Sequence, residues 1–282
     1  MQIPSCIQIE TTNICNARCP FCAHYLMKRP IGMMTDELFN KIIDELSQIW
    51  KDASYATAIH PDLSGECFCD PKIFERFKII NERLPNTSID IFTNGYLLGP
   101  DFREKLLEIK NIGLLRLSLN YIEGDYERNM GLRWDIILNN LRALKDMQDK
   151  YHFTKLFRVG AIDDEDNPQN NTKFINFVIS EGFNNPDINK DMSYSIAFKT
   201  NWMGTLKVKN TLGINEECRF LAHLCILYDG SVSLCCYDYD GKYILGNLNK
   251  QTILEVYNGA ERAKYLIGVK KDHTPCNLCN TR

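Results

Sequence analysis

The first 200 residues alternate between short stretches of period two and longer stretches whose apolar residues recur every three or four positions. Residues 6–10 alternate apolar and polar side chains, which is typical of a strand with one buried face. Apolar residues recur at helical spacing from Leu38 to Ile49. Thr35 before this stretch predicts an N-cap, and Asp36 and Glu37 suit the positive end of the helix dipole.

The same alternation repeats up to residue 198. It predicts strands at 6–10, 54–59, 88–93, 114–120, 154–161 and 192–198, and helices at 35–49, 71–83, 102–109, 134–147 and 172–179. Strands that alternate with helices in this way form parallel β/α structures. We therefore expect an α/β fold.

The pattern changes from Cys218 onward. Residues 224–228 and 231–235 flank Asp229-Gly230, a dipeptide that favours a tight hairpin turn. Residues 252–266 have helical spacing. This part of the chain predicts a small second domain.

Composition narrows the possible partners. The chain has 282 residues, a net charge of −3 and a sequence pI near 6.0, without a long basic run, which argues against nucleic acid or an anionic membrane. Neither a secretory signal nor an apolar stretch of about 18 residues is visible. We expect a soluble cytoplasmic protein.

Twelve cysteines are many for such a protein. In a reducing compartment they indicate metal binding or catalysis rather than disulfides. Half of them precede residue 70, and the other half begin at Cys218. Two separate groups predict two metal sites.

The first group contains the run Cys15-x3-Cys19-x2-Cys22. A loop of this length can direct three thiolates to one point, which suits a 4Fe–4S cluster. A structural zinc site normally has four protein ligands. Three ligands would leave one iron open for chemistry, although three buried or zinc-binding cysteines are the alternative.

This run, with Phe21 before the third cysteine, resembles the signature of the radical S-adenosylmethionine (radical SAM) enzymes. The resemblance implies a partial, TIM-like (β/α)6 barrel whose site lies at the carboxyl ends of the strands. It also implies that the open iron binds SAM, which is cleaved to methionine and a 5′-deoxyadenosyl radical.

Three further motifs resemble SAM-binding motifs of this family. Ser64-Gly65-Glu66 resembles its Gly-Gly-Glu motif, which receives the SAM amino group, with serine in place of the first glycine. Thr93-Asn94-Gly95 resembles a Thr-Asn-Gly turn. Ser118 and Asn120 resemble a pair that contacts the ribose, and strand alternation predicts that both point to the same side.

The second group of cysteines resembles the SPASM domain and its truncated form, the twitch domain. The resemblance implies that one auxiliary 4Fe–4S cluster is held by Cys218, Cys235, Cys276 and Cys279. A full SPASM domain has more cysteines after the C-x2-C, so a twitch domain is expected. The predicted domains are 1–204 and 205–282, and a four-cysteine zinc site is the alternative.

The remaining cysteines have simpler interpretations. Cys225 is expected in the core, and Cys67 and Cys69 are expected to pack as small apolar residues. Cys236 follows a proposed ligand, so strand alternation would turn it away from the cluster. In some epimerases of this architecture such a thiol returns a hydrogen atom to the substrate radical.

The resemblance implies an oxidoreductase. We expect dehydrogenation of a small polar substrate, such as a sugar or aminocyclitol, with the auxiliary cluster accepting an electron from it. We also expect a flavodoxin- or ferredoxin-like partner protein as the reductant. The alternatives are an epimerase that uses Cys236 or a peptide-modifying maturase. The start of the first strand near Cys6 leaves no room for a leader-binding domain and favours a small substrate. A metal-binding protein without catalysis is a remote alternative.

Overall fold

The computed structural model describes residues 2–53, 55–183, 192–209, 218–268 and 276–280. The chain forms two compact units, the first of residues 1–14, 23–87 and 200–282, and the second of residues 15–22 and 88–199. Residue 54 of one predicted strand and residues 210–217, 269–275 and 281–282 of the predicted second domain lie outside the description. The boundary at residues 204/205 stays a prediction.

The first unit contains a sheet in the order β2-β1-β7-β8-β9. Its strands are β1 (Cys6–Ile9), β2 (Ala58–His60), β7 (Leu224–Ile226), β8 (Ser231–Ser233) and β9 (Ile244–Asn247). β1 is parallel to both β2 and β7, while β7, β8 and β9 are antiparallel. Ile7 pairs with Ile59 on one side and Leu224 on the other. The predicted hairpin therefore continues the sheet of β1.

Helix α1 of this unit confirms its prediction. The helices are α1 (Asp36–Ile49), α2 (Ile73–Arg83), α7 (Ile253–Tyr257) and α8 (Ala260–Gly268), with short 3-10 turns η1 (Ala23–Leu26), η2 (Cys67–Cys69), η3 (Arg219–Ala222) and η4 (Cys276–Leu278). The Thr35 hydroxyl accepts a hydrogen bond from Leu38 N at 3.2 Å. The apolar face of α1 is buried, so the helical spacing identified the face correctly.

Three predictions in this unit need correction. The strand expected at 54–59 is β2, which begins only at Ala58. The helix expected at 252–266 is two helices. The first, α7, is capped at its C-terminus by Asn258, and the second, α8, begins at Ala260. The helix expected from Pro71 begins later, at Ile73. There the Asp70 carboxylate accepts from Lys72 N at 2.9 Å and holds the first residues in a turn.

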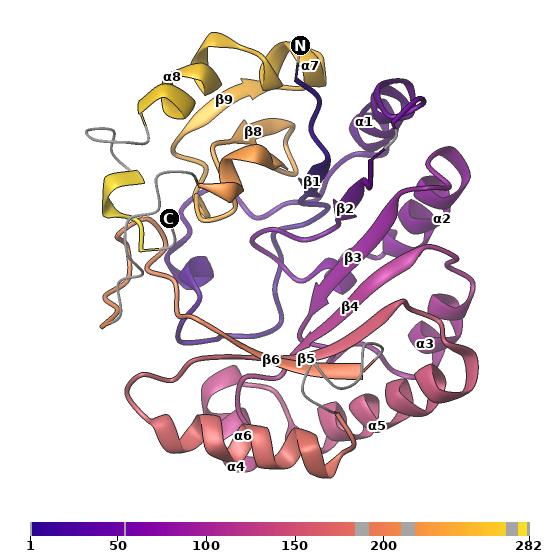
Figure 1. Ribbon diagram of the computed structural model, residues 1–282, viewed down its shortest axis with the longest axis vertical. Helices are drawn as coiled ribbons and strands as arrows, with labels where there is room; N and C mark the ends of the chain where they lie inside the picture. The colour runs from indigo at the N-terminus through magenta and orange to yellow at the C-terminus, as the bar shows by residue number, and fades with distance from the viewer. Residues whose placement is uncertain (1, 54, 184–191, 210–217, 269–275, 281–282) are drawn as a thin grey trace. The chain divides into compact units, whose positions relative to one another are not determined.

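The second unit contains four parallel strands in the order β3-β4-β5-β6. They are β3 (Ser88–Thr93), β4 (Ile112–Ser118), β5 (Leu156–Ile162) and β6 (Met192–Ala197). The helices of this unit are α3 (Pro100–Leu107), α4 (Glu123–Met130), α5 (Trp134–Tyr151) and α6 (Pro168–Ser180). They lie along one side of these strands (Figure 1). This strand–helix alternation agrees with the predicted α/β class.

Helix α4 was not predicted as a helix. Only Tyr126 and Met130 of its eight residues are buried, so its apolar pattern is too sparse to see in the sequence. It ends at Gly131, whose φ of 71° is in the left-handed region, where glycine is favoured.

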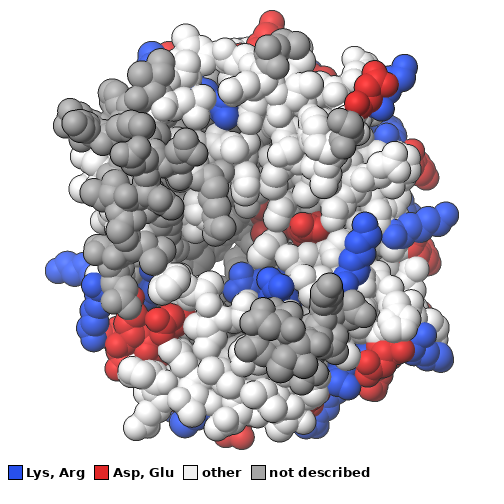
Figure 2. All heavy atoms as spheres, in the orientation of Figure 1, with Lys and Arg blue, Asp and Glu red and all other residues white. Residues whose placement is uncertain are grey.

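Acidic and basic side chains are interspersed over the face shown in Figure 2. Among the described residues, none of the helices has the length and apolarity that crossing a membrane requires.

Candidate functional site

The base of the cysteine loop is fixed by Asn13, which is fully buried. Its Nδ2 donates to Pro30 O at 2.8 Å, and its Oδ1 accepts from Gly32 N at 2.8 Å. Thr12 Oγ1 also donates to Gly32 O at 3.0 Å. The chain that enters the loop is thus joined to the chain that leaves it. Sequence reasoning missed Asn13, although a polar residue between a strand and a cysteine run was a visible signal.

Gly65 lies against this same base. A Cβ at Gly65 would be 2.4 Å from Thr12 O and 2.8 Å from Asn13 Cα, which only glycine avoids. Glu66 N donates to Ile14 O at 2.8 Å. The Ser64-Gly65-Glu66 segment is therefore held beside the residues that lead into Cys15.

The side chain of Glu66 is buried. Its carboxylate accepts from Phe68 N at 3.4 Å and so caps η2. The proposed role of Glu66 toward the SAM amino group stays a prediction.

The three loop cysteines belong to the second unit, and their thiols are half-buried. Cys22 N donates to Cys19 O at 3.1 Å and Arg18 N donates to Met130 O at 3.0 Å. Asn94 Nδ2 donates to Asn16 Oδ1 at 2.7 Å. The end of β3 and the end of α4 therefore both hold the loop.

The Thr93-Asn94 turn is built by its own side chains. Thr93 Oγ1 accepts from Gly95 N at 2.9 Å, and Asn94 Oδ1 accepts from Tyr96 N at 3.0 Å. Asn140 of α5, buried and unpredicted as a site residue, donates to the carbonyl oxygens of Gly95 and Tyr96 at 3.0 Å each. These contacts orient Asn94 toward the cysteine loop.

The premise that placed Ser118 and Asn120 on one side of a strand is wrong. β4 ends at Ser118, and Asn120 has a φ of 63°, in the left-handed region. The Asn120 amide donates to Ser118 O at 3.1 Å and accepts from Ile162 N at 3.2 Å. Asn120 thus joins the ends of β4 and β5, and its predicted contact with the ribose stays a prediction.

A small pocket in the second unit opens beside Phe21. It is lined by Pro20, Phe21, Tyr121, Ile162, Asp163, Asp164 and Lys199. The rings of Phe21 and Tyr121 are 6.3 Å apart at their centroids and inclined by 32°. Burial, with Asp164 nearby, raises the pKa of Tyr121 to about 12, so its hydroxyl keeps its proton at neutral pH. This pocket combines aromatic walls with polar groups.

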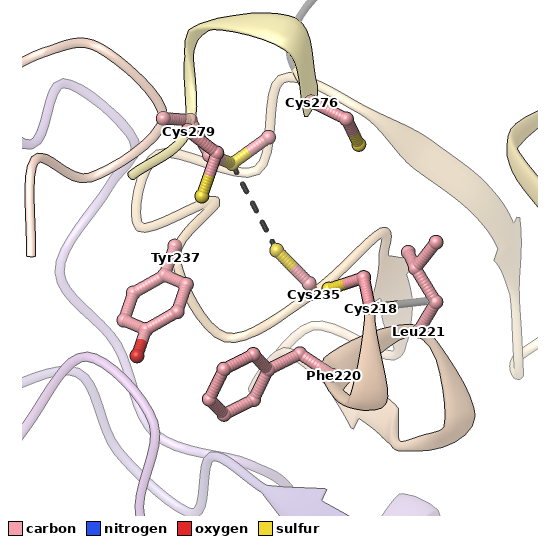
Figure 3. A pocket seen from close by; sticks show the side chains of 8 residues that line it. Cys218, Phe220, Leu221, Cys235, Tyr237, Cys276 and Cys279 are labelled. Carbon is pink, nitrogen blue, oxygen red and sulfur yellow. Dashed lines mark hydrogen bonds between the residues drawn. The ribbon is translucent and has the colours of Figure 1, made fainter. Parts of the chain in front are cut away.

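The structure brings the four cysteines of the second group together. Cys218, Cys235, Cys276 and Cys279 line one pocket with Met203, Phe220, Leu221 and Tyr237 (Figure 3). Burial raises the pKa of the Cys235 thiol well above its ordinary value, and its sulfur is 3.8 Å from Met203 Sδ. Within the described residues, no three metal-ligating side chains are grouped closely enough for one ion. The four cysteines surround a space rather than converge on a point.

A segment at residues 201–204 supports this pocket. Asn201 Nδ2 donates to Leu278 O at 2.6 Å, between Cys276 and Cys279. The Trp202 ring meets Tyr237 edge-on at 5.7 Å between centroids. Trp202 therefore packs behind Tyr237, one of the residues that line this auxiliary pocket.

The other cysteines are placed as follows. Cys225 is buried and its thiol donates to Gln8 Oε1 at 3.1 Å, which confirms it as a core residue, and Cys67 is buried as expected. β8 ends at Ser233, so strand alternation does not reach Cys236. Burial raises the pKa of Cys236 to about 12, with contributions from Cys218 and Cys279. Cys236 is not among the residues that line the four-cysteine pocket, and its predicted orientation away from the cluster stays a prediction.

These donor sets fit iron–sulfur clusters. Three half-buried cysteines on a loop would leave an open coordination position on a 4Fe–4S cluster, and four cysteines between apolar walls would provide complete thiolate ligation. The sequence profile of the Radical SAM superfamily matches residues 9–169, more than half of the chain. The chain belongs to the radical SAM superfamily. The profile of SPASM, an iron–sulfur cluster-binding domain, matches residues 218–281. This radical SAM protein therefore uses SAM and 4Fe–4S clusters.

Solved structures of radical SAM enzymes have the same fold. BtrN in complex with AdoMet and 2-DOIA is 18% identical with a TM-score of 0.65, over 99% of this chain and 94% of that chain. Streptococcus suis SuiB bound to its precursor peptide SuiA is 16% identical with a TM-score of 0.70, over 100% and 70%. The anSMEcpe enzyme with AdoMet and the Cp18Cys peptide is 16% identical with a TM-score of 0.68, over 97% and 85%. No protein with a curated description matches the sequence significantly.

Proposed function

We propose that this radical SAM enzyme removes a hydrogen atom from a small polar substrate, such as a sugar or aminocyclitol, and oxidises it through one auxiliary cluster. The auxiliary pocket carries the proposal. Its four thiols provide every ligand of a cubane cluster, so no iron remains open to bind substrate. A fully ligated cluster suits electron transfer, and an oxidation needs an acceptor for the second electron.

The residues that would hold the SAM-binding cluster are Cys15, Cys19 and Cys22. When bound, this cluster supplies one electron and an open iron to SAM, which yields methionine and the 5′-deoxyadenosyl radical. The loop base at Asn13 and the turn at Asn94 orient the three thiols. We assign Gly65 and Glu66 to the SAM amino group by their similarity to the family motif.

We assign the adenosine part of SAM to the surroundings of Phe21 by their similarity to the family signature. The pocket there has a volume of about 30 Å³, so adenosine would have to widen it. Aromatic rings offer flat apolar surfaces to a base, and the Tyr121 hydroxyl and Lys199 offer hydrogen-bond donors. Asn120 fixes the neighbouring backbone of β4 and β5, and Ser118 and Thr93 complete the polar surroundings by their similarity to the family motifs.

The small-substrate class is supported by the fold of BtrN, which aligns with nearly the whole of this chain and over 94% of its own. SuiB and anSMEcpe, solved with peptides, keep a larger part of their chains outside the alignment. Sequence identities of 16–18% establish a similar fold only. The substrate class therefore needs an experimental test.

An epimerase that uses Cys236 is the second candidate. Cys236 directly follows the proposed ligand Cys235. Burial raises the pKa of its thiol to about 12, so the thiol keeps the hydrogen atom that a donor needs. An epimerase returns a hydrogen atom and leaves the substrate at the same oxidation level, whereas a dehydrogenase does not. Cys236→Ala would therefore abolish product formation only in an epimerase. A peptide-modifying maturase would instead act on a peptide and not on sugars or 2-DOIA.

The test uses the full chain, reconstituted anaerobically with iron and sulfide and incubated with SAM and dithionite. About eight irons per chain are expected from two 4Fe–4S clusters, with 5′-deoxyadenosine formed and lost in Cys15→Ala. Carbon-deuterated aminocyclitols and sugars, 2-DOIA included, serve as probes. Deuterium in 5′-deoxyadenosine together with an oxidised product supports the proposal. SAM cleavage without deuterium transfer from any member of this panel would reject the substrate class.

A further inference from the structure

A buried ion pair links the end of β1 to the segment that follows the cysteine loop. Glu10 is fully buried and Arg29 is 11% exposed. Arg29 Nη1 donates to Glu10 Oε1 at 2.6 Å, and its Nη2 donates to Glu10 Oε2. A buried carboxylate needs such a partner, because an unpaired buried charge is costly. Arg29 is therefore held in one position.

The same arginine reaches the loop that carries Cys235. Arg29 Nε donates to Tyr239 O at 3.0 Å. Asp240 Oδ1 accepts from the backbone nitrogens of Lys28 and Arg29, at 2.6 and 3.1 Å. Residues 28–29 are thus joined to residues 239–240 by both backbone and side chain.

A buried aspartate makes the loop at residues 235–243 rigid. A displacement of Cys235 at one end of the loop therefore also displaces residues 239–240. Asp238 is 4% exposed. Its carboxylate accepts from Ser233 Oγ at 2.8 Å and from the backbone nitrogens of Lys242 and Tyr243 at 2.9 Å each. Asp238 N also donates to Cys235 O at 3.1 Å. The position of Cys235 therefore determines where Tyr239 and Asp240 lie.

We infer that Arg29 is a positioning residue that makes SAM cleavage depend on the auxiliary site. Ligation of Cys235 fixes residues 239–240, and these fix Lys28 and Arg29. Arg29 in turn fixes the adjoining Pro30, whose carbonyl oxygen Asn13 joins to the base of the cysteine loop. The inference rests on the proposed function, because it takes Cys235 as a cluster ligand and Cys22 as a ligand of the SAM-binding cluster.

The two sites should then be coupled rather than independent, and a double-mutant cycle measures such coupling. The four proteins are the wild type, Asp240→Ala, Cys276→Ser/Cys279→Ser, and their combination, each reconstituted and assayed for 5′-deoxyadenosine with SAM and dithionite. Asp240 is half-exposed, so its replacement should leave the fold intact. Arg83→Met, which removes an exposed ion pair with Asp44, is the matched control.

Each of the two changes is expected to slow 5′-deoxyadenosine formation about fivefold or more, which is an ordinary size for coupled sites. The combination is expected to be no slower than the slower of the two. Arg29→Lys keeps a positive charge beside Glu10 but lacks the Nε–H that reaches Tyr239, and should behave like Asp240→Ala. In both, SAM should perturb the EPR spectrum of the reduced cluster less than in the wild type, a change that a structural role alone would not produce.

Losses that multiply in the combination would overturn the inference, as would a full rate in Asp240→Ala or in the cysteine variant. A wild type that cleaves no SAM would instead remove the proposed function, so the two failures are distinguishable.

Discussion

Asn201 and Asn280 exchange hydrogen bonds between backbone and side chain. Asn201 N donates to Asn280 Oδ1 at 2.8 Å, and Asn280 N donates to Asn201 Oδ1 at 3.2 Å. Asn280 directly follows the proposed ligand Cys279 and is 3% exposed. This pair joins the segment at residues 201–204 to the end of the auxiliary site.

Asn201→Ala should therefore weaken the auxiliary site selectively. It removes the acceptor of Asn280 N, which belongs to a buried residue, at a cost of about 1–3 kcal/mol, and it also removes the exposed hydrogen bond to Leu278 O. We expect iron to fall from about eight to about four per chain while the loop cysteines keep their cluster. Iron analysis with EPR checks this, and Asn40→Ala, which removes one exposed hydrogen bond, should leave iron unchanged. Loss of iron from both sites in equal measure would contradict the selectivity.

Replacing Asn13 tests the base of the cysteine loop. Asn13→Ala removes the acceptor of Gly32 N and one of the two donors to Pro30 O, which also accepts from the Tyr228 hydroxyl. We therefore expect a loss of about 1–3 kcal/mol in the free energy of unfolding. It should also reduce the iron retained by the loop cysteines. Urea denaturation of the protein without clusters measures the first effect. A loss below about 0.5 kcal/mol would mean that the loop base does not depend on Asn13.

A methyl group at Gly65 should have a large effect. Its Cβ would meet the backbone at Thr12 O and Asn13 Cα, and backbone cannot move aside as a flexible side chain can. We expect a cost of about 1–3 kcal/mol and at least a tenfold weaker affinity for SAM, measured by equilibrium binding to the reconstituted protein. Gly124→Ala is the control, because nothing lies within 4 Å of its Cβ position. Normal SAM affinity in Gly65→Ala would show that the motif tolerates a side chain.

The buried thiol of Cys225 makes stability depend on pH. Burial raises its pKa well above the ordinary value of 9.0. The folded protein therefore keeps this proton after the unfolded chain has lost it, and stability falls as the pH rises above 9. The difference in unfolding free energy between wild type and Cys225→Ala should be constant below pH 8. Above pH 9, the wild type should lose about 1.4 kcal/mol of unfolding free energy per pH unit relative to Cys225→Ala.

Denaturation curves of the two proteins from pH 7 to 11 measure this difference. Other groups titrate in the same range, but they are common to both proteins and cancel. A difference that stays constant up to pH 11 would mean that Cys225 ionises in the folded state as easily as in the unfolded chain.

Much of the fold could be predicted because local spacing determines it. The buried face of α1 follows from five apolar residues at helical intervals, and the parallel strands follow from repeated alternation. Helix α4 could not be predicted, because few apolar residues mark it. The break at Asn258 had a signal that the helical spacing obscured, since Asn258-Gly259 is a dipeptide that favours a turn. β9 was missed for a similar reason, since it is four residues long and includes a glycine.

The candidate site could be predicted where the spacing of cysteines matches a known cluster-binding pattern. The four cysteines of the auxiliary pocket come from places far apart in the chain, yet their resemblance to a known pattern identified them, and the structure brings them together. Among the residues that hold the site, Asn13 had only its place between a strand and the cysteine run as a signal, and Asn140 and Asp238 had none. Their role depends on which backbone groups lie opposite them, which only the fold reveals.

The pairing of β1 with β7 has a consequence for synthesis. Gln8 and Cys225, which are register partners on these strands, are separated by 217 positions. In a nascent chain, one side of β1 therefore stays unpaired until residues 224–226 have been synthesised. Contacts between such distant residues form slowly, and an exposed strand edge invites pairing with other chains. A protein cut after residue 204 would keep that open edge, and we expect it to aggregate rather than to stand as an independent barrel.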